Sequence, residues 1–464
     1  MAQSVNNKAY YDLGNKKIST LLKQYAWPAI IAMTATSLYN IVDAIFIGQK
    51  LGPMAISGLA ITFPFMNLGA AVGSLVGVGS ASILSIFLGQ KNHKGIDAVL
   101  GNNLMLNIII GITYSVIALI FLDPLLTFFG ASENTLPYAK EYMSIILIGN
   151  VFTHLYWGFN GIIRAAGHPK KAMSASMFSV IINIFFDYLF IIVMDSGIAG
   201  AAYATMLSQI LSLIYQTILL TNKKELVRFK KGIYHLDRNI IKKIFSIGMS
   251  PFLMNAVGCI VVIIINRSLL HYGGDIYIGA YGIINRVAFV TLMINMGLTQ
   301  GMQPIVGYNY GAENRKRVLD TVHLTMKIAT IILTVGWLLY EIIPETLVGF
   351  FTNDAELIKI SARGMRIELI AFPFIGYAIV ASNFFQSIGK AKTAIFLSLT
   401  RQLIFLIPFL LILPIFFNTD GVWAANAVSD IISTVVAYIM FIRFRKSYKL
   451  EDKTSINNIT KDYE

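Results

Sequence analysis

Two carboxylates, Asp43 and Asp187, lie inside apolar runs that are each about as long as a membrane-spanning helix. Tyr39 precedes Asp43 by four residues and Asn183 precedes Asp187 by four, so on a helix the members of each pair share one face. Lipid does not solvate an ionised carboxylate, and one that is retained in mid-membrane indicates a functional site. The alternative is that these side chains only hydrogen-bond neighbouring helices.

The depth of these residues in the membrane predicts that they meet. Asp43 and Asp187 lie beyond the midpoints of outward-going helices, whereas Thr205 lies early in an inward-going one. We therefore expect one site in the outer half of the membrane, formed by Tyr39, Asp43, Asn183, Asp187 and Thr205.

Two carboxylates in a low-dielectric cavity cannot both stay ionised cheaply, and either a proton or a sodium ion relieves their repulsion. Oxygens of Asp43, Asn183, Asp187 and Thr205 are hard ligands that suit Na⁺, whereas Tyr and Asn side chains could equally hold a protonated acid. The residue types do not choose between the two ions.

The composition is that of an integral membrane protein. Of 464 residues, 56% are hydrophobic and 13% are charged, and the mean hydropathy is +0.67. An average soluble domain carries roughly twice that share of charge. The single cysteine, Cys259, excludes a disulfide framework, and the six histidines show no ligand spacing, so we expect no metal cluster and no cofactor other than the coupling ion. The first apolar run is too long for a signal-peptide core, so we expect the N-terminus to be retained.

Apolar runs predict an all-α membrane protein of twelve transmembrane helices. Their limits are 21–47, 55–88, 98–122, 136–163, 172–194, 198–221, 241–270, 277–309, 318–343, 356–386, 393–416 and 421–443. Lys and Arg are concentrated in every second connection, and Asp and Glu in the others. By the positive-inside rule both termini are cytoplasmic, in a bacterial-type inner membrane. The basic residues thus belong to cytoplasmic loops, and we expect no nucleic acid as a partner.

The chain is internally duplicated. At an offset of 222 residues, Gly89-Gln90-Lys91-Asn92-His93-Lys94 falls on Gly311-Ala312-Glu313-Asn314-Arg315-Lys316. We therefore predict two pseudo-symmetric six-helix lobes, related by an axis along the membrane normal. The segments are a cytoplasmic N-terminal segment 1–20, a lobe 21–221, a cytoplasmic loop 222–240, a lobe 241–443 and a cytoplasmic tail 444–464. Asp43 falls on Ile265 and Asp187 on Phe409, which favours a specialised site in the first lobe.

Other residues within the spans have two interpretations each. Pro28 weakens the first helix locally, so it marks either a hinge or a fixed kink. Arg286 and Arg401 either bond neighbouring helices or snorkel, with gating or anion recognition as the alternative. Asn40 has either a gating or a structural role. Lys359, Arg363, Arg366 and Glu368 are expected to reach the outer interface. The 30 Phe, 22 Tyr and 18 Met residues suit a cavity that binds flat lipophilic cations.

Several segments resemble the multidrug and toxic compound extrusion (MATE) family of antiporters, and within it the DinF-like branch. The matching segments are 39–48 (YNIVDAIFIG), which includes Asn40, 164–167 (RAAG), Asn183 with Asp187, 200–205 (GAAYAT) and 303–312 (QPIVGYNYGA). The resemblance covers roughly residues 16 to 445. It implies that Pro28, Tyr39, Asp43, Asn183, Asp187 and Thr205 form a cation-coupling site. The related NorM-like branch has a further acid in the seventh span, and this chain has none between Pro251 and Asn266.

We therefore expect a cation-coupled antiporter, driven by H⁺ or Na⁺, that exports lipophilic and often cationic small molecules by alternating access. We expect it to act as a monomer among membrane lipids and not as an enzyme. The alternatives are a lipid-linked oligosaccharide flippase of the same superfamily, which would need basic groups lining its cavity, and a channel, which would show passive flux. No P-loop is present, which argues against direct use of ATP.

Overall fold

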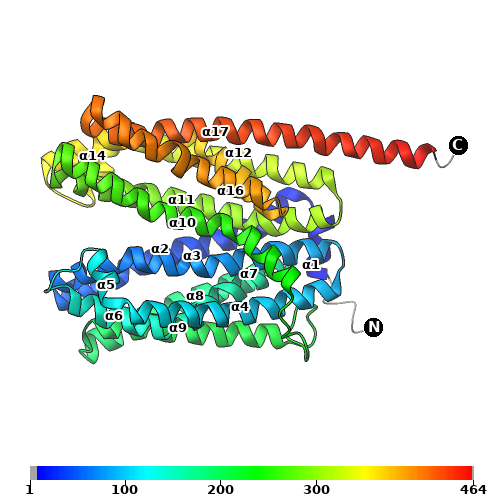
Figure 1. Ribbon diagram of the computed structural model, residues 1–464, viewed down its shortest axis with the longest axis horizontal. Coiled ribbons are helices and arrows are strands. Elements are labelled where there is room, and N and C mark those ends of the chain that lie inside the picture. The colour runs from blue at the N-terminus through cyan, green and yellow to red at the C-terminus, as the bar shows by residue number, and fades with distance from the viewer. Residues whose placement is uncertain (1–7, 462–464) are drawn as a thin grey trace.

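The computed structural model describes residues 8–461, and within that range it does not describe the side chains of residues 8, 9, 38–41, 44, 45, 49, 53 and 449–461. All regular structure in the described range is helical (Figure 1). The first half contains α1 (Lys8–Asn15), α2 (Ile18–Leu51), α3 (Pro53–Gly89), α4 (His93–Ile120), α5 (Leu122–Phe128), α6 (Leu136–Ile148), α7 (Asn150–Ala165), α8 (Pro169–Asp187), the π-helix η1 (Tyr188–Val193) and α9 (Gly197–Thr221). The second half contains α10 (Arg238–Gly273), α11 (Asp275–Gly311), α12 (Arg315–Ile342), α13 (Pro344–Gly349), α14 (Ala355–Glu368), α15 (Phe372–Ser387), α16 (Ala391–Leu399), the π-helix η2 (Thr400–Leu406) and α17 (Ile407–Lys461).

The predicted all-α membrane architecture is confirmed. Eight described helices are long and apolar enough to cross a membrane, and the bent pair α14 and α15 is a ninth candidate. One of the eight, Ala391–Tyr448, contains a backbone turn at Asn418 (φ 50°) and so holds two of the predicted spans. The first and fourth predicted spans coincide with α2 and with the pair α6 and α7, so every predicted span has its helical segment.

The helices of the structure differ from the predicted spans in two ways: some spans are interrupted, and one helix continues beyond its predicted end. The fourth span is interrupted at Gly149, where a Cβ atom would lie 1.8 Å from the Met206 side chain. The tenth span is bent by 54° between Glu368 and Phe372. In contrast, the segment 444–464, expected to be a tail, continues α17 as a helix as far as Lys461. Apolar runs locate spans but carry little information on such interruptions.

The two halves of the chain occupy separate parts of the molecule, with α2 to α9 on one side and α10 to α17 on the other (Figure 1). They cross where α3 meets α10 and where α2 meets α11. At Gly248 of α10 a Cβ atom would lie 1.7 Å from the Leu75 carbonyl oxygen, and at Gly297 of α11 it would lie 2.5 Å from Ile30 Cα. Leu75 of the first crossing and Gly297 of the second are related by the offset of 222 residues. Corresponding helices of the two halves, α3 and α11, therefore each pack closely against the opposite half.

The apolar core is shared at one end of the molecule and divided at the other. At the end with the basic loops, a single core joins both halves and includes Leu22, Val76, Ile244 and Ile305. Toward the opposite end, one core is built only from residues of the first half, between Phe46 and Met206. Two further cores there are built only from residues of the second half. The halves are therefore packed together at the basic end and have separate cores at the other.

Candidate functional site

The two aspartates predicted from the sequence lie next to each other inside the first half. Asp43 on α2 is 5% exposed and Asp187 at the end of α8 is fully buried. α2 packs directly on α8 and on η1, which begins immediately after Asp187. Their carboxyl groups are close enough to interact electrostatically. π-helical turns occur often at functional sites, and here one adjoins Asp187.

Asn183 and Thr205 form the neighbouring part of the site. Asn183 lies one helical turn before Asp187, and its Nδ2 donates a hydrogen bond to Thr205 Oγ1 of α9 at 3.5 Å. Both residues are buried, and the packing of α8 on α9 brings them together. The Asn183 Oδ1 atom has no hydrogen-bond donor among the described side chains. This oxygen is thus available to a bound cation or to a protonated acid.

Most oxygens of the two carboxyl groups have no hydrogen-bond donor among the described residues. Both oxygens of Asp187 and the Oδ1 atom of Asp43 accept no hydrogen bond from any described donor. Two ionised carboxylates have no proton to donate to each other, so a hydrogen bond between them needs one bound proton. A sodium ion between the carboxylates, with Asn183 Oδ1 as a further ligand, would relieve their repulsion in the same way. The pair is therefore suited to bind and release one monovalent cation.

The remaining residues of the predicted site have different positions. The side chains of Tyr39 and Asn40 lie outside the described residues, so their contacts with Asp43 stay a prediction. α2 continues as a helix through Pro28. Arg286 of α11 is exposed, on the helix face turned away from the core. Arg401 lies within η2 and makes an ion pair with buried Asp430 of α17, which is the helix-to-helix contact considered for it.

One prediction about the second half is wrong. Lys359, Arg363 and Arg366 are exposed, as expected near an interface, but Glu368 is buried, with 7% of its surface accessible. It accepts a hydrogen bond from Asn426 Nδ2 at 3.2 Å. The sequence analysis also overlooked Asp430, although Asp430 lies in an apolar run just as Asp187 does. The burial of Glu368 could have been predicted from the helical spacing of Ser361, Met365 and Glu368, which form one buried face of α14.

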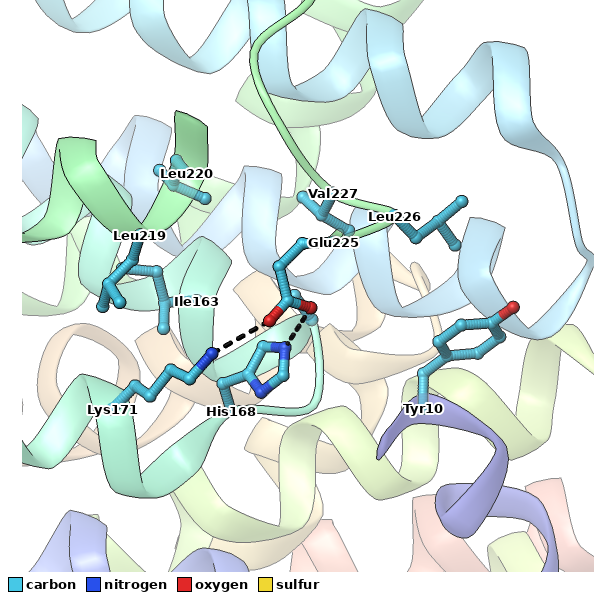
Figure 2. Close-up of a pocket in the computed structure, with 10 residues that line it drawn as sticks. Tyr10, Ile163, His168, Lys171, Leu219, Leu220, Glu225, Leu226 and Val227 are labelled. Carbon is cyan, nitrogen blue, oxygen red and sulfur yellow. Dashed lines mark hydrogen bonds and ion pairs between the residues drawn. The ribbon is translucent and has the colours of Figure 1, made fainter. Parts of the chain in front are cut away.

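A small cavity lies at the basic end of the first half, between α7, α9 and the loop that follows α9 (Figure 2). Glu225 of that loop accepts hydrogen bonds from His168 Nε2 at 2.8 Å and from Lys171 Nζ at 2.9 Å. The bond from His168 and the nearby Lys171 ammonium lower the pKa of the Glu225 carboxyl to about 2, against the opposing effect of burial. The contacts attach the central loop to the start of α8, which is a structural role. Among the described residues no group of three or more His, Cys, Asp or Glu side chains could hold a metal ion.

Comparison with known proteins gives consistent matches over almost the whole chain. The MatE family model matches residues 28–189 and 247–412. The multidrug export protein MepA of Staphylococcus haemolyticus is 26% identical over 437 residues, which cover 94% of this chain and 95% of the relative. MepA of Staphylococcus aureus is 23% identical over 453 residues, which cover 98% of both chains.

Solved structures show the same fold. A multidrug resistance MATE family transporter of the MOP superfamily in an outward-facing conformation superimposes with a TM-score of 0.90 at 23% identity, over 95% of this chain and 99% of that one. A MATE structure in a bent conformation gives a TM-score of 0.89 at 23% identity, over 97% of this chain and 99% of that one. At this identity the likeness concerns the fold.

Proposed function

We infer that this chain, which belongs to the MatE family of multi-pass membrane transporters, exports lipophilic and often cationic small molecules in exchange for an inward-moving proton or sodium ion. The protein is a transporter and not an enzyme, and the relatives that match nearly its full length are named multidrug export proteins. The observation that carries the proposal is the buried pair of Asp43 and Asp187, in which both oxygens of Asp187 and the Oδ1 atom of Asp43 have no described donor.

The coupling follows from the charge of this pair. With one cation bound, the net charge of the pair is reduced by one and the repulsion between the carboxylates is relieved; without it, they repel each other in a buried site. An organic cation bound to the first half would compete with the coupling ion for the same negative charge. Each ligand shifts the conformational equilibrium by its difference in affinity for the two states, so their opposite effects give exchange. In this cycle, binding of the coupling ion shifts α2 near Pro28 and releases the substrate outward.

The division of the apolar core supports alternating access. A shared core holds the two halves together at the basic end, and separate cores lie at the other end. With the basic loops and both termini in the cytoplasm of a bacterial-type cell, this arrangement corresponds to a transporter that is closed inward. We propose that the lobes 21–221 and 241–443 rock against each other about the crossings of α3 with α10 and of α2 with α11, in a monomer surrounded by lipid.

The test is transport by purified protein in liposomes. The liposomes contain a fluorescent lipophilic cation, and a pH gradient and a sodium gradient are imposed separately. We expect one gradient to drive uphill movement of the dye, which identifies the coupling ion, and we expect Asp187→Asn to abolish that movement. If neither gradient moves the dye and a labelled lipid-linked oligosaccharide crosses the bilayer instead, the antiporter proposal is replaced by the flippase.

A further inference from the structure

The second half contains a buried ionic cluster that the proposed cycle does not use. Glu368 ends α14, Asp430 and Asn426 lie on α17, and Arg401 lies in the π-helix η2. Glu368 and Asp430 are 7% and 2% exposed. The packing of α14 on α17, and of α17 on η2, brings the four side chains together from three segments. They lie in a part of the chain predicted to be within the membrane.

The charges of this cluster do not balance when both acids are ionised. Arg401 donates from Nε and from Nη2 to the two carboxylate oxygens of Asp430, so one guanidinium neutralises that carboxylate. Glu368 Oε1 receives only a neutral amide hydrogen bond, from Asn426. Its Oε2 atom is buried and has no partner among the described side chains. A buried ion without a countercharge costs several kcal/mol, so the ionised form of Glu368 is disfavoured.

The groups around Glu368 favour a proton over a metal cation. Asp430 of α17 adds negative charge beside Glu368. Arg401 of η2 adds a positive charge there, which repels a metal cation. Tyr281 of α11 is near enough to interact with both Glu368 and Arg401. On the opposite side of α14, Arg366 contacts Glu345 of α13 and the Glu341 carbonyl of α12 and does not enter the cluster. One proton on Glu368 makes the cluster neutral.

Position in the duplicated fold also connects this cluster with the first site. Thr205 follows Gly200 by five residues, and Asn426 follows Gly421 by five, so the two polar residues occupy matching places on the last helix of each half. Glu368 is also the last residue before the 54° bend between α14 and α15. The side chain of Arg401 is 32% exposed, whereas that of Asp430 is 3% exposed, so Arg401 forms the accessible edge of the cluster.

We propose that Glu368, held beside Asp430, Arg401 and Asn426, is a second proton-binding site of this protein, located in the second half at the bend of the tenth span. The proton enters on the side of Arg401, binds the Glu368 carboxylate and leaves by the reverse step. The acids of this site come from helices that do not correspond to α2 and α8. The site therefore does not require the aspartates of the first half.

The test measures carboxyl protonation directly and does not depend on transport. Infrared difference spectra between acidic and alkaline pH are recorded on purified protein in which Asp43→Asn and Asp187→Asn silence the first site. We expect a band of a buried protonated carboxyl group to remain in this double variant. Adding Glu368→Gln should remove the band, and adding Glu356→Gln, an exposed acid of the same helix, should leave it unchanged.

Two outcomes would overturn the proposal: no buried carboxyl band in the double variant, or a band that survives Glu368→Gln. If Glu368→Gln fails to fold, Arg401→Gln provides the second measurement. This change removes the only positive charge among the four residues, so the band should persist to higher pH, and an unchanged pH dependence would count against the site. Because the readout is spectroscopic, this proposal can fail while drug export stands, and the reverse.

Discussion

Thr205 and Asn426 occupy matching positions on the last helices of the two halves but have opposite hydrogen-bonding roles. Thr205 Oγ1 accepts a bond from Asn183 at 3.5 Å, whereas Asn426 Nδ2 donates to the Glu368 carboxylate at 3.2 Å. Both residues are buried, and each is hydrogen-bonded to a polar residue from another helix of its own half. The duplicated fold therefore retains a polar position at one depth in the membrane, and the surrounding acids differ.

Replacing either aspartate of the first site should uncouple transport without unfolding the protein. In Asp187→Asn and Asp43→Asn the charge that binds the coupling ion is lost and the side-chain volume is kept. We expect gradient-driven uphill export in liposomes to be abolished, because without this charge the ion gradient no longer drives the substrate. Asp275→Asn, an exposed acid at the start of α11, is the matched control and should transport normally. Wild-type export by both site variants would contradict the assignment.

The hydroxyl of Thr205 should contribute to ion affinity through Asn183. Thr205→Val keeps the shape of the side chain and removes the acceptor of the Asn183 Nδ2 hydrogen bond. We expect the coupling ion to bind ~5-fold more weakly, corresponding to about 1 kcal/mol for one lost hydrogen bond. The measurement is the ion concentration that gives half-maximal export. Thr217→Val is the control on the same helix, because its hydroxyl bonds only the Leu213 carbonyl. Equal affinities in the two variants would exclude this role.

The sequence predicted which buried polar residues lie together in the first half but not in the second, for physical reasons. Asp43 and Asp187 are charged residues in apolar runs, and helical depth was enough to predict that Asn183 and Thr205 lie together. The position of Glu368 was predicted wrongly because exposed Arg363 and Arg366 precede it, and charged residues at a helix end are typical of a membrane interface. Its burial depends on contacts with α17, some 60 residues later in the chain, which local composition does not reveal.

The same limit applies to the fold. Apolar run lengths predicted twelve spans, each of which has a helical segment in the structure, because a bilayer imposes a length on each helix. They did not predict the interruption at Gly149 or the bend after Glu368, because both depend on packing against neighbouring helices. The offset of 222 residues revealed the duplication. The duplication did not reveal that the two halves share an apolar core only at the basic end. How the halves pack on each other depends on the conformation of the whole protein, which a comparison of the two half-sequences does not contain.

The crossing of α3 and α10 should not tolerate a side chain at Gly248. A Cβ atom there would lie 1.7 Å from the Leu75 carbonyl oxygen, so backbone must move in Gly248→Ala. We expect the apparent unfolding temperature to fall, with a cost of about 1–3 kcal/mol as for other overpacked sites. Export should also slow, because the halves pack together here at the basic end. Gly282→Ala of α11 is the control, since nothing lies within 4 Å of its Cβ position. Equal unfolding temperatures for both variants would show that the crossing adapts.

The Glu225 contacts should give a stability difference that depends on pH. The pKa of this carboxyl is about 2 in the folded protein, below its ordinary value of 4.5, because His168 and Lys171 bind the ionised form. A lowered carboxyl pKa contributes stability that is fully present above the unfolded value and is lost as the pH falls toward the folded value. Glu225→Gln should therefore unfold at a lower temperature than the wild type at pH 7, and the difference should shrink between pH 5 and pH 3.

The measurement is thermal unfolding of both proteins in detergent across that range of pH. Glu133→Gln, an exposed acid in the loop before α6, controls for the loss of one negative charge and should follow the wild type. A difference that stays constant from pH 7 to pH 3 would mean that Glu225 acts through packing alone. A difference that grows as the pH falls would have the wrong sign for a lowered pKa and would exclude the ion pairs as its source.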